Sequence, residues 1–227
     1  MNQQNHKTKM QMSETFLLNG ILAFSGGFQD AYTYNVRDEV FSNAQTGNVV
    51  LMSQHFMTGE WTEALRYLFP LLAFTLGVLL AEQIQYYHKY KDRVHWRQKI
   101  LLIEIVILFA VGFIPTGFNT VAAILVSFTC AMQVQSFRKI DGYSYASTMC
   151  IGNLRSGTDA LSVYLRERKP EQLKRCLYYF GIIFLFAIGA GIGGILSKRY
   201  GVRMIWFSCG FLLVSFLLMF LEKLKED

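Results

Sequence analysis

Charged residues are scarce in this sequence: they make up 17% of its 227 residues, whereas hydrophobic residues make up 52%. Most of the charges lie between long apolar runs and few lie within them. Runs of about 20 apolar residues are typical of helices that cross a bilayer, and not of a soluble core. The scarcity of charge therefore excludes an ordinary soluble domain and predicts an integral membrane protein with the lipid bilayer as a partner.

The sequence also lacks the motifs that carry catalysis or metal binding. It contains no His-Glu-x-x-His, no Gly-x-Ser-x-Gly and no phosphate-binding P-loop, so we expect no enzyme and no cofactor. Its four cysteines are scattered, with no histidine at metal-ligand spacing, which predicts buried thiols and no metal site. The net charge is +6, but the basic residues lie in short loops beside apolar segments, which favours membrane topology control over nucleic-acid binding.

Six stretches are long and apolar enough to predict membrane spans. No Ala-x-Ala cleavage site follows the first of them, so we expect the chain to retain it. Two further stretches, 44–57 and 149–165, are shorter or more polar, and either enter the membrane without crossing it or add a seventh and an eighth span. The six predicted spans are approximately Thr15–Tyr34, Ala64–Gln85, Ile100–Thr116, Thr120–Phe137, Leu177–Ser197 and Val202–Leu221.

The charge of the loops distinguishes the two topologies. Loops 88–99 and 166–175 are rich in lysine and arginine, so both are expected to face the cytoplasm. Both do so, together with both termini, if the two short stretches do not cross the membrane. If both cross, the first basic loop moves outside. The positive-inside rule therefore favours six spans, although Lys198, Arg199 and Arg203 would then lie outside.

One unusual pattern occurs twice, about 105 residues apart. A polar break at 26–30 precedes the Thr-Gly-Asn of 46–48, and a second break at 130–136 precedes the Ile-Gly-Asn of 151–153. With three spans per copy, the second copy must enter from the opposite side, which is inverted-repeat symmetry. We therefore predict an all-α polytopic membrane helix bundle with six spans and two short broken or re-entrant helices. Its expected parts are a polar tail 1–14, repeat 15–117, repeat 118–222 and a C-terminal tail 223–227.

Polar groups at such breaks predict a binding site, because breaks and ionisable groups are costly inside a membrane. Asp30 is either a proton carrier or cation ligand, or it is a helix-terminal cap or a partner of Arg37. The Gly-Asn elements either hold a polar or anionic solute or merely end a helix and satisfy its backbone. The predicted site residues are Gln29, Asp30, Thr46, Gly47, Asn48, Gln133, Gln135, Gly152 and Asn153.

Glu104 and the small residues have structural interpretations. Glu104 follows the first basic loop closely, so we expect it to reach the membrane interface or to pair with Arg97 or Lys99. Phe-x-x-small-x-x-x-small patterns predict close helix contacts within the bundle, with a homodimer interface as the alternative. The small residues concerned are Gly77, Ala81, Gly189 and Gly193.

Several of these motifs resemble those of the YoaK family of bacterial integral membrane proteins. They are Gly26 to Ala31 with Phe41 and Thr46-Gly47-Asn48, then Phe74-x-x-Gly77, and Ala131 to Gln133 in the second half. Family members tend to have Gln-Asn-Ala and Thr-Gly-Thr in the second half, where this chain has Gln133-Val134-Gln135 and Ile151-Gly152-Asn153. The resemblance implies a six-span protein of a family whose function is undetermined.

Two function hypotheses follow from the sequence. The first is a transporter or channel of the bacterial plasma membrane for a small polar solute or ion, with its site between the two Gly-Asn elements. The second is a non-transporting assembly partner or sensor, whose interior would be dry. An intramembrane enzyme is a third and weaker alternative, because no nucleophile and base are paired in the sequence.

Overall fold

The chain is almost entirely helical in the computed structural model, which describes residues 11–88 and 95–224. The predicted all-α class is therefore confirmed. The single pair of strands in the described part consists of two residues on each side of a turn. In chain order the elements are η1 (Met12–Glu14), α1 (Phe16–Val36), α2 (Gln45–Thr58), α3 (Trp61–His88), α4 (Trp96–Val111), η2 (Thr116–Phe118), α5 (Asn119–Ser136), β1 (Lys139–Ile140), β2 (Tyr143–Ser144), α6 (Cys150–Glu167), α7 (Pro170–Tyr200), η3 (Gly201–Met204) and α8 (Ile205–Leu224).

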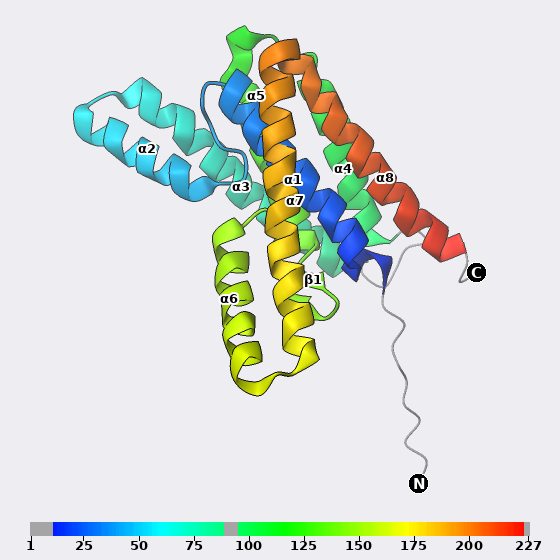
Figure 1. Cartoon of the computed structure of the whole chain (residues 1–227). Helices are drawn as coiled ribbons and strands as arrows, with labels where there is room; N and C mark the ends of the chain where they lie inside the picture. The colour runs from blue at the N-terminus through cyan, green and yellow to red at the C-terminus, as the bar shows by residue number, and fades with distance from the viewer. Residues whose placement is uncertain (1–10, 89–94, 225–227) are drawn as a thin grey trace.

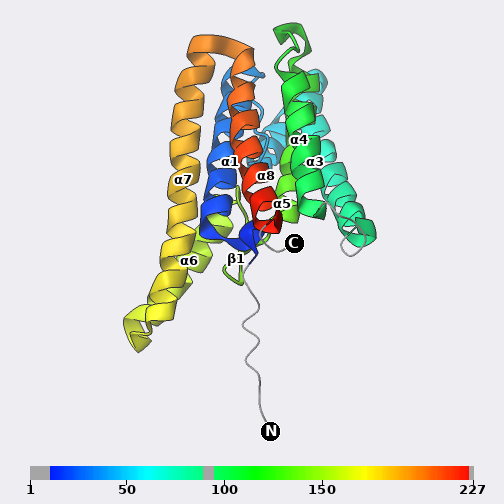
Figure 2. The same cartoon turned by 90° about the vertical axis from the view of Figure 1, so that its right-hand side faces the viewer.

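Helices α1, α3, α4, α5, α7 and α8 lie side by side in a bundle, and helices α2 and α6 lie at opposite ends of it (Figure 1). α2 packs on α3 near the upper end, and α6 packs on α7 near the lower end. The hairpin of α6 and the first half of α7 extends beyond the other helices (Figure 2). In each half of the chain, a loop turns back into the bundle, then α2 or α6 follows, and then α3 or α7 begins.

The contacts between helices are the same for the two halves of the chain. α1 packs on α7 as α5 packs on α3, α2 packs on α3 as α6 packs on α7, and α4 packs on α5 as α8 packs on α1. The remaining large contact joins α4 to α8. Exchanging α1–α4 with α5–α8 therefore reproduces the same set of large contacts.

Three stretches of the described residues are long and apolar enough to cross a membrane: Trp61–His88, Thr116–Ser136 and Pro170–Glu222. The last of them contains both α7 and α8. α4 has only 16 residues, and α1 carries Gln29 and Asp30, so neither is among the three. These helices are compatible with a membrane protein.

The outer faces of these helices are covered by large apolar side chains. In a soluble protein such a surface would be costly, whereas a lipid environment solvates it. Examples are Leu72 and Leu79 of α3, Phe184 and Ile195 of α7, and Leu213 and Phe220 of α8. The exposed surface of the bundle is therefore apolar, as the high proportion of hydrophobic residues in the sequence leads one to expect.

Glycines bring pairs of helix backbones into direct contact. A Cβ added to Gly189 of α7 would lie 2.0 Å from the carbonyl oxygen of Phe24 in α1. A Cβ added to Gly77 of α3 would lie 2.3 Å from the carbonyl oxygen of Phe128 in α5. Close approach of this kind needs small residues at the interface. The prediction of tight packing inside the bundle is confirmed at both helix pairs.

The four small residues that a homodimer interface would use are not exposed on the surface of the chain. Gly77 and Ala81 are buried on α3, and Gly189 and Gly193 are buried on α7. Gly193 also faces α1, where an added Cβ would lie 2.8 Å from the Cα of Phe28. Both small-residue stripes are therefore covered by helices of the same chain.

Candidate functional site

Asp30 anchors the loop that joins α1 to α2. Its Oδ1 accepts hydrogen bonds from the backbone N–H of Asn43 at 2.8 Å and from the hydroxyl of Ser42 at 3.2 Å. Both bonds are buried, and a carboxylate that accepts backbone N–H groups forms strong charge-assisted bonds. The suggested pairing with Arg37 is wrong, because that side chain binds other groups. Asp30 therefore holds the first loop inside the bundle.

The asparagine of each Gly-Asn element clamps the backbone seven residues before it. Asn48 accepts from the N–H of Phe41 at 3.1 Å and donates to its carbonyl at 2.7 Å. Asn153 binds Ala146 in the same two ways, at 3.3 and 2.6 Å. A side-chain amide has both a donor and an acceptor, so it can satisfy both backbone groups of a residue in a broken segment. In both copies, therefore, the asparagine satisfies backbone groups, as one of the two interpretations of the Gly-Asn elements predicts.

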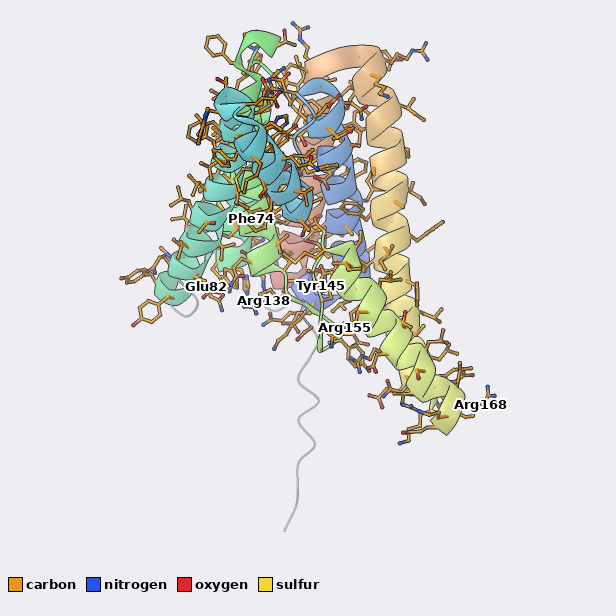
Figure 3. The ribbon with its side chains drawn as sticks, turned by 90° about the vertical axis from the view of Figure 1, so that its left-hand side faces the viewer. Phe74, Glu82, Arg138, Tyr145, Arg155 and Arg168 are labelled. Atoms are coloured by element: carbon orange, nitrogen blue, oxygen red, sulfur yellow. The ribbon has the colours of Figure 1, made fainter. Side chains whose placement is uncertain are left out.

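Three of the predicted site residues lie toward the outside of the bundle. Thr46 and Gly152 are exposed in the first turns of α2 and α6, and a Cβ added to Gly152 would meet no atom within 4 Å. Gln135 donates a hydrogen bond to Glu82, which lies near Arg138 at the lower end of α3 (Figure 3). The structure does not bring these three side chains together.

Gly47 is needed for close packing against Phe41 and not for a tight turn of the backbone. Its φ is not positive, since it lies inside the first turn of α2. A Cβ added there would lie 3.0 Å from the ring of Phe41, the residue whose backbone Asn48 clamps. Gly47 therefore leaves room for the clamped residue.

The loops that precede α2 and α6 meet at Gly26, near the middle of α1. Asn43 of the first loop donates from Nδ2 to the carbonyl oxygen of Gly26 at 3.1 Å. Thr148 of the second loop approaches the same residue so closely that an added Cβ would lie 2.3 Å from its Cγ2. The glycine therefore allows both broken segments to reach one point of the bundle.

Gln133 extends this meeting point to the preceding turn of α1. From α5 it donates Nε2 to the carbonyl of Leu22 and to the hydroxyl of Ser147, each at 3.4 Å. Its contact with Ser147 corresponds to the contact of Asp30 with Ser42 in the first half. An amide and an acid therefore hold equivalent serines in the two loops.

Three polar atoms at this meeting point have no hydrogen-bond partner within the described residues. They are Oδ1 of Asn43, Oγ1 of Thr148 and Oε1 of Gln133, all on buried side chains. An unsatisfied buried polar group costs about 1–3 kcal/mol, so most such groups have a partner. The three side chains come from both halves of the chain, and each contacts α1 at Gly26 or Leu22.

Glu104 lies fully buried in α4, so the expectation that it reaches the interface or pairs with Arg97 or Lys99 is wrong. The Oε1 of Glu104 accepts from Nε2 of Gln29 at 3.3 Å, and Oε2 has no partner in the described part of the chain. Arg97 instead lies 3.5 Å from Glu14. The apolar residues on both sides of Glu104 were the available signal that it lies deep in the bundle.

Gln29 connects three helices around this acid. Its Nε2 also donates to the hydroxyl of Ser25 at 3.2 Å, and its Oε1 accepts from the thiol of Cys130 at 2.8 Å. Gln29 thus joins α1 to Glu104 on α4 and to Cys130 on α5. It is adjacent in sequence to Asp30, so the network around Glu104 adjoins the anchor of the first loop.

Arg37 forms a second buried centre, which pattern analysis did not identify. Its guanidinium donates to the hydroxyl of Tyr32 at 2.9 Å and to Oδ1 of Asn119 at 3.0 Å. It also donates to the carbonyls of Val111 at 3.1 Å and Ile114 at 2.9 Å. Carbonyls at a helix C-terminus carry partial negative charge, which a cation stabilises. Arg37 therefore fastens α1 to the end of α4 and the start of α5.

The described residues contain no group of three histidine, cysteine, aspartate or glutamate side chains that could hold a metal ion. The four cysteines are free thiols: Cys130 and Cys176 are buried, and Cys150 and Cys209 are partly buried. The site chemistry in this part of the chain therefore comes from amides, hydroxyls and the two buried acids Asp30 and Glu104.

Comparisons with known proteins identify a family and no function. No curated protein and no solved structure matches the chain. One family model matches residues 18–218, which include α2 to α7 and most of α1 and α8. Its description does not name the YoaK family that the motifs resemble. On the length of this match, the chain belongs to the family described as "Protein of unknown function (DUF1275)".

Proposed function

We propose that the protein is a transporter or channel of the bacterial plasma membrane for a small polar solute or ion, and not an enzyme. The observation that carries the proposal is the set of partnerless polar atoms on Asn43, Thr148 and Gln133. They lie where loops from both halves of the chain meet α1. Sites between two repeats, formed by broken helices, are typical of secondary transporters.

The proposed architecture has six spans and two inverted repeats. It is supported by the equivalent helix contacts of the two halves and by the positions of α2 and α6 at opposite ends (Figure 1). The start of α1 and the end of α8 lie at the lower end of the bundle, as does Arg168 in the loop between α6 and α7 (Figure 3). This arrangement agrees with cytoplasmic termini and a cytoplasmic loop 166–175. Residues 89–94 of loop 88–99 lie outside the described residues.

The chemistry of the site favours a solute that donates hydrogen bonds or carries positive charge. Asn43 and Gln133 each use the amide nitrogen on a backbone carbonyl, which assigns the free atom of each amide as an acceptor oxygen. The hydroxyl of Thr148 can donate or accept. The earlier expectation of an anionic solute has less support, because the partnerless amide atoms are acceptors.

Uptake into liposomes tests the proposal, with Gln133→Leu and Gln135→Leu as a matched pair on one helix. Purified protein would be reconstituted and offered labelled methylammonium, sodium, potassium, small amino acids and polyols. We expect uptake of at least one of these above that of empty liposomes. Gln133→Leu should reduce it by about tenfold, since tenfold corresponds to about 1.4 kcal/mol, which is within the range that one hydrogen bond contributes.

Gln135→Leu should leave uptake close to that of the unmodified protein, because this side chain binds Glu82 away from the site. Gel filtration of both variants would show that they remain folded. Equal uptake by protein-containing and empty liposomes for every solute would contradict the proposal and favour the assembly-partner hypothesis. Equal losses in the two variants would contradict the assignment of the site to the meeting point on α1.

A further inference from the structure

Glu104 occupies a place in the bundle where no described cation balances it. α1 presents Gln29 to it, α5 presents the thiol of Cys130, and α8 presents Cys209, whose Sγ lies 3.8 Å from the carbonyl oxygen of Ile105. None of these groups carries positive charge. Arg97, about two helical turns before Glu104, binds Ser13, Ser136 and Glu14 at the end of the bundle and does not reach Glu104.

An isolated carboxylate in such surroundings is strongly disfavoured, because it loses its hydration without gaining a cation. A protonated carboxyl needs only one donor and one acceptor contact. Oε1 of Glu104 already accepts from Gln29, whereas Oε2 has no partner among the described residues. The atom left for a proton is therefore Oε2.

We propose that Glu104 is a proton-binding site, with an exchangeable proton on Oε2 and Gln29 as the residue that positions the carboxyl. Gln29 donates to Oε1, which is an acceptor whether or not Oε2 carries the proton. Its neighbour Asp30 holds Ser42 and Asn43 in the first loop. Gln29 and Asp30 thereby link the proton on Glu104 to the first loop, which contributes Asn43 to the meeting point on α1.

This inference rests on the proposed function and deepens it, because it assigns proton coupling to Glu104. The sequence pointed to Asp30 for that role. In the structure Oδ1 of Asp30 accepts from two donors of the first loop, whereas Glu104 accepts from Gln29 alone and its Oε2 is buried without a partner among the described residues. The second acid is the better proton site for this reason.

Infrared spectroscopy of the reconstituted protein tests the inference directly. A protonated carboxyl has a carbonyl stretch that an ionised carboxylate and an amide lack. The difference spectrum between the unmodified protein and Glu104→Gln at neutral pH should contain this band. The band should shift when the sample is transferred to heavy water, because the proton exchanges. Glu82→Gln is the matched control: this acid is about half exposed and pairs with Arg138, so its replacement should remove no such band.

Two results would overturn the inference. One is a difference spectrum without the band, which would mean that Glu104 is ionised. The other is a band that heavy water leaves unshifted, which would mean a buried proton without exchange. If Glu104→Gln does not fold, Glu104→Asp replaces it, and the band should then move in frequency; an unchanged band would equally contradict the assignment.

The spectra need no transport, so the two proposals can fail separately. A band that is lost in Glu104→Gln, together with absent uptake, leaves the proton site standing and removes the transport function. Uptake without the band removes the proton site and leaves the transport function standing.

Discussion

Arg37→Ala is expected to lower the free energy of unfolding by at least about 3 kcal/mol, because it leaves several buried acceptors without a donor. The partners that lose it are Tyr32, Asn119 and the carbonyls of Val111 and Ile114. Each unsatisfied group costs about 1–3 kcal/mol, and the large side chain also leaves a cavity. Thermal or detergent unfolding of the purified protein, followed by tryptophan fluorescence, measures the change.

Arg66→Ala is the matched control for Arg37→Ala. Arg66 pairs with Glu63 one helical turn away in α3, and both side chains are about one-third exposed. Partly exposed pairs of this kind contribute about 0–1 kcal/mol, so the control should unfold almost as the unmodified protein does. Equal stability of the two arginine variants would contradict the role assigned to Arg37.

Gly189→Ala is expected to separate α1 from α7 and to lower the free energy of unfolding by about 1–3 kcal/mol, the usual cost of overpacking. The added methyl group would lie 2.0 Å from the carbonyl oxygen of Phe24. The obstacle is backbone, so no side-chain rotation can relieve the contact. Melting curves of the variant and the unmodified protein give the comparison.

Gly191→Ala tests the same chemistry two residues further along the same helix. No atom lies within 4 Å of the position of its added methyl group. Alanine is favoured over glycine inside a helix by about 1 kcal/mol, so this variant should be as stable as the unmodified protein or more stable. Opposite or clearly different effects support the close contact of α1 with α7. Equal destabilisation by both substitutions would refute it.

The duplicated pattern could be recognised from the sequence because its residues are close together in each copy. Gly and Asn are adjacent in each copy, and Asn48 and Asn153 each bind the backbone of a residue only seven positions earlier. The small residues of α3 and α7 were also recognisable, since spacing alone places them on one helix face. Which helix each face contacts depends on tertiary structure and could not be predicted.

Arg37 and Glu104 show where the prediction failed. Asp30 and Arg37 are seven residues apart, a spacing that brings them to one side of a helix. Arg37 lies just beyond the end of α1, however, and turns toward α4 and α5. Glu104 is near a basic loop in sequence, yet its direction is set by the packing of α4 against α5 and α8. Apart from Tyr32, the groups that bind Arg37 and Glu104 lie far from them in the sequence. No sequence pattern therefore specifies these contacts.

In the proposed transporter or channel, loops from both halves of the chain form a polar site that is open to water or solute. The most direct measurement is the rate at which a small, charged thiol reagent modifies Thr148→Cys. The background would lack the native cysteines, with serine at Cys130 to keep the donor to Gln29. Ala122→Cys is the control, because Ala122 is fully buried in the apolar cluster around Leu108 and Leu212. We expect Thr148→Cys to react and Ala122→Cys not to react; a Thr148→Cys variant as unreactive as the control would contradict an open polar site.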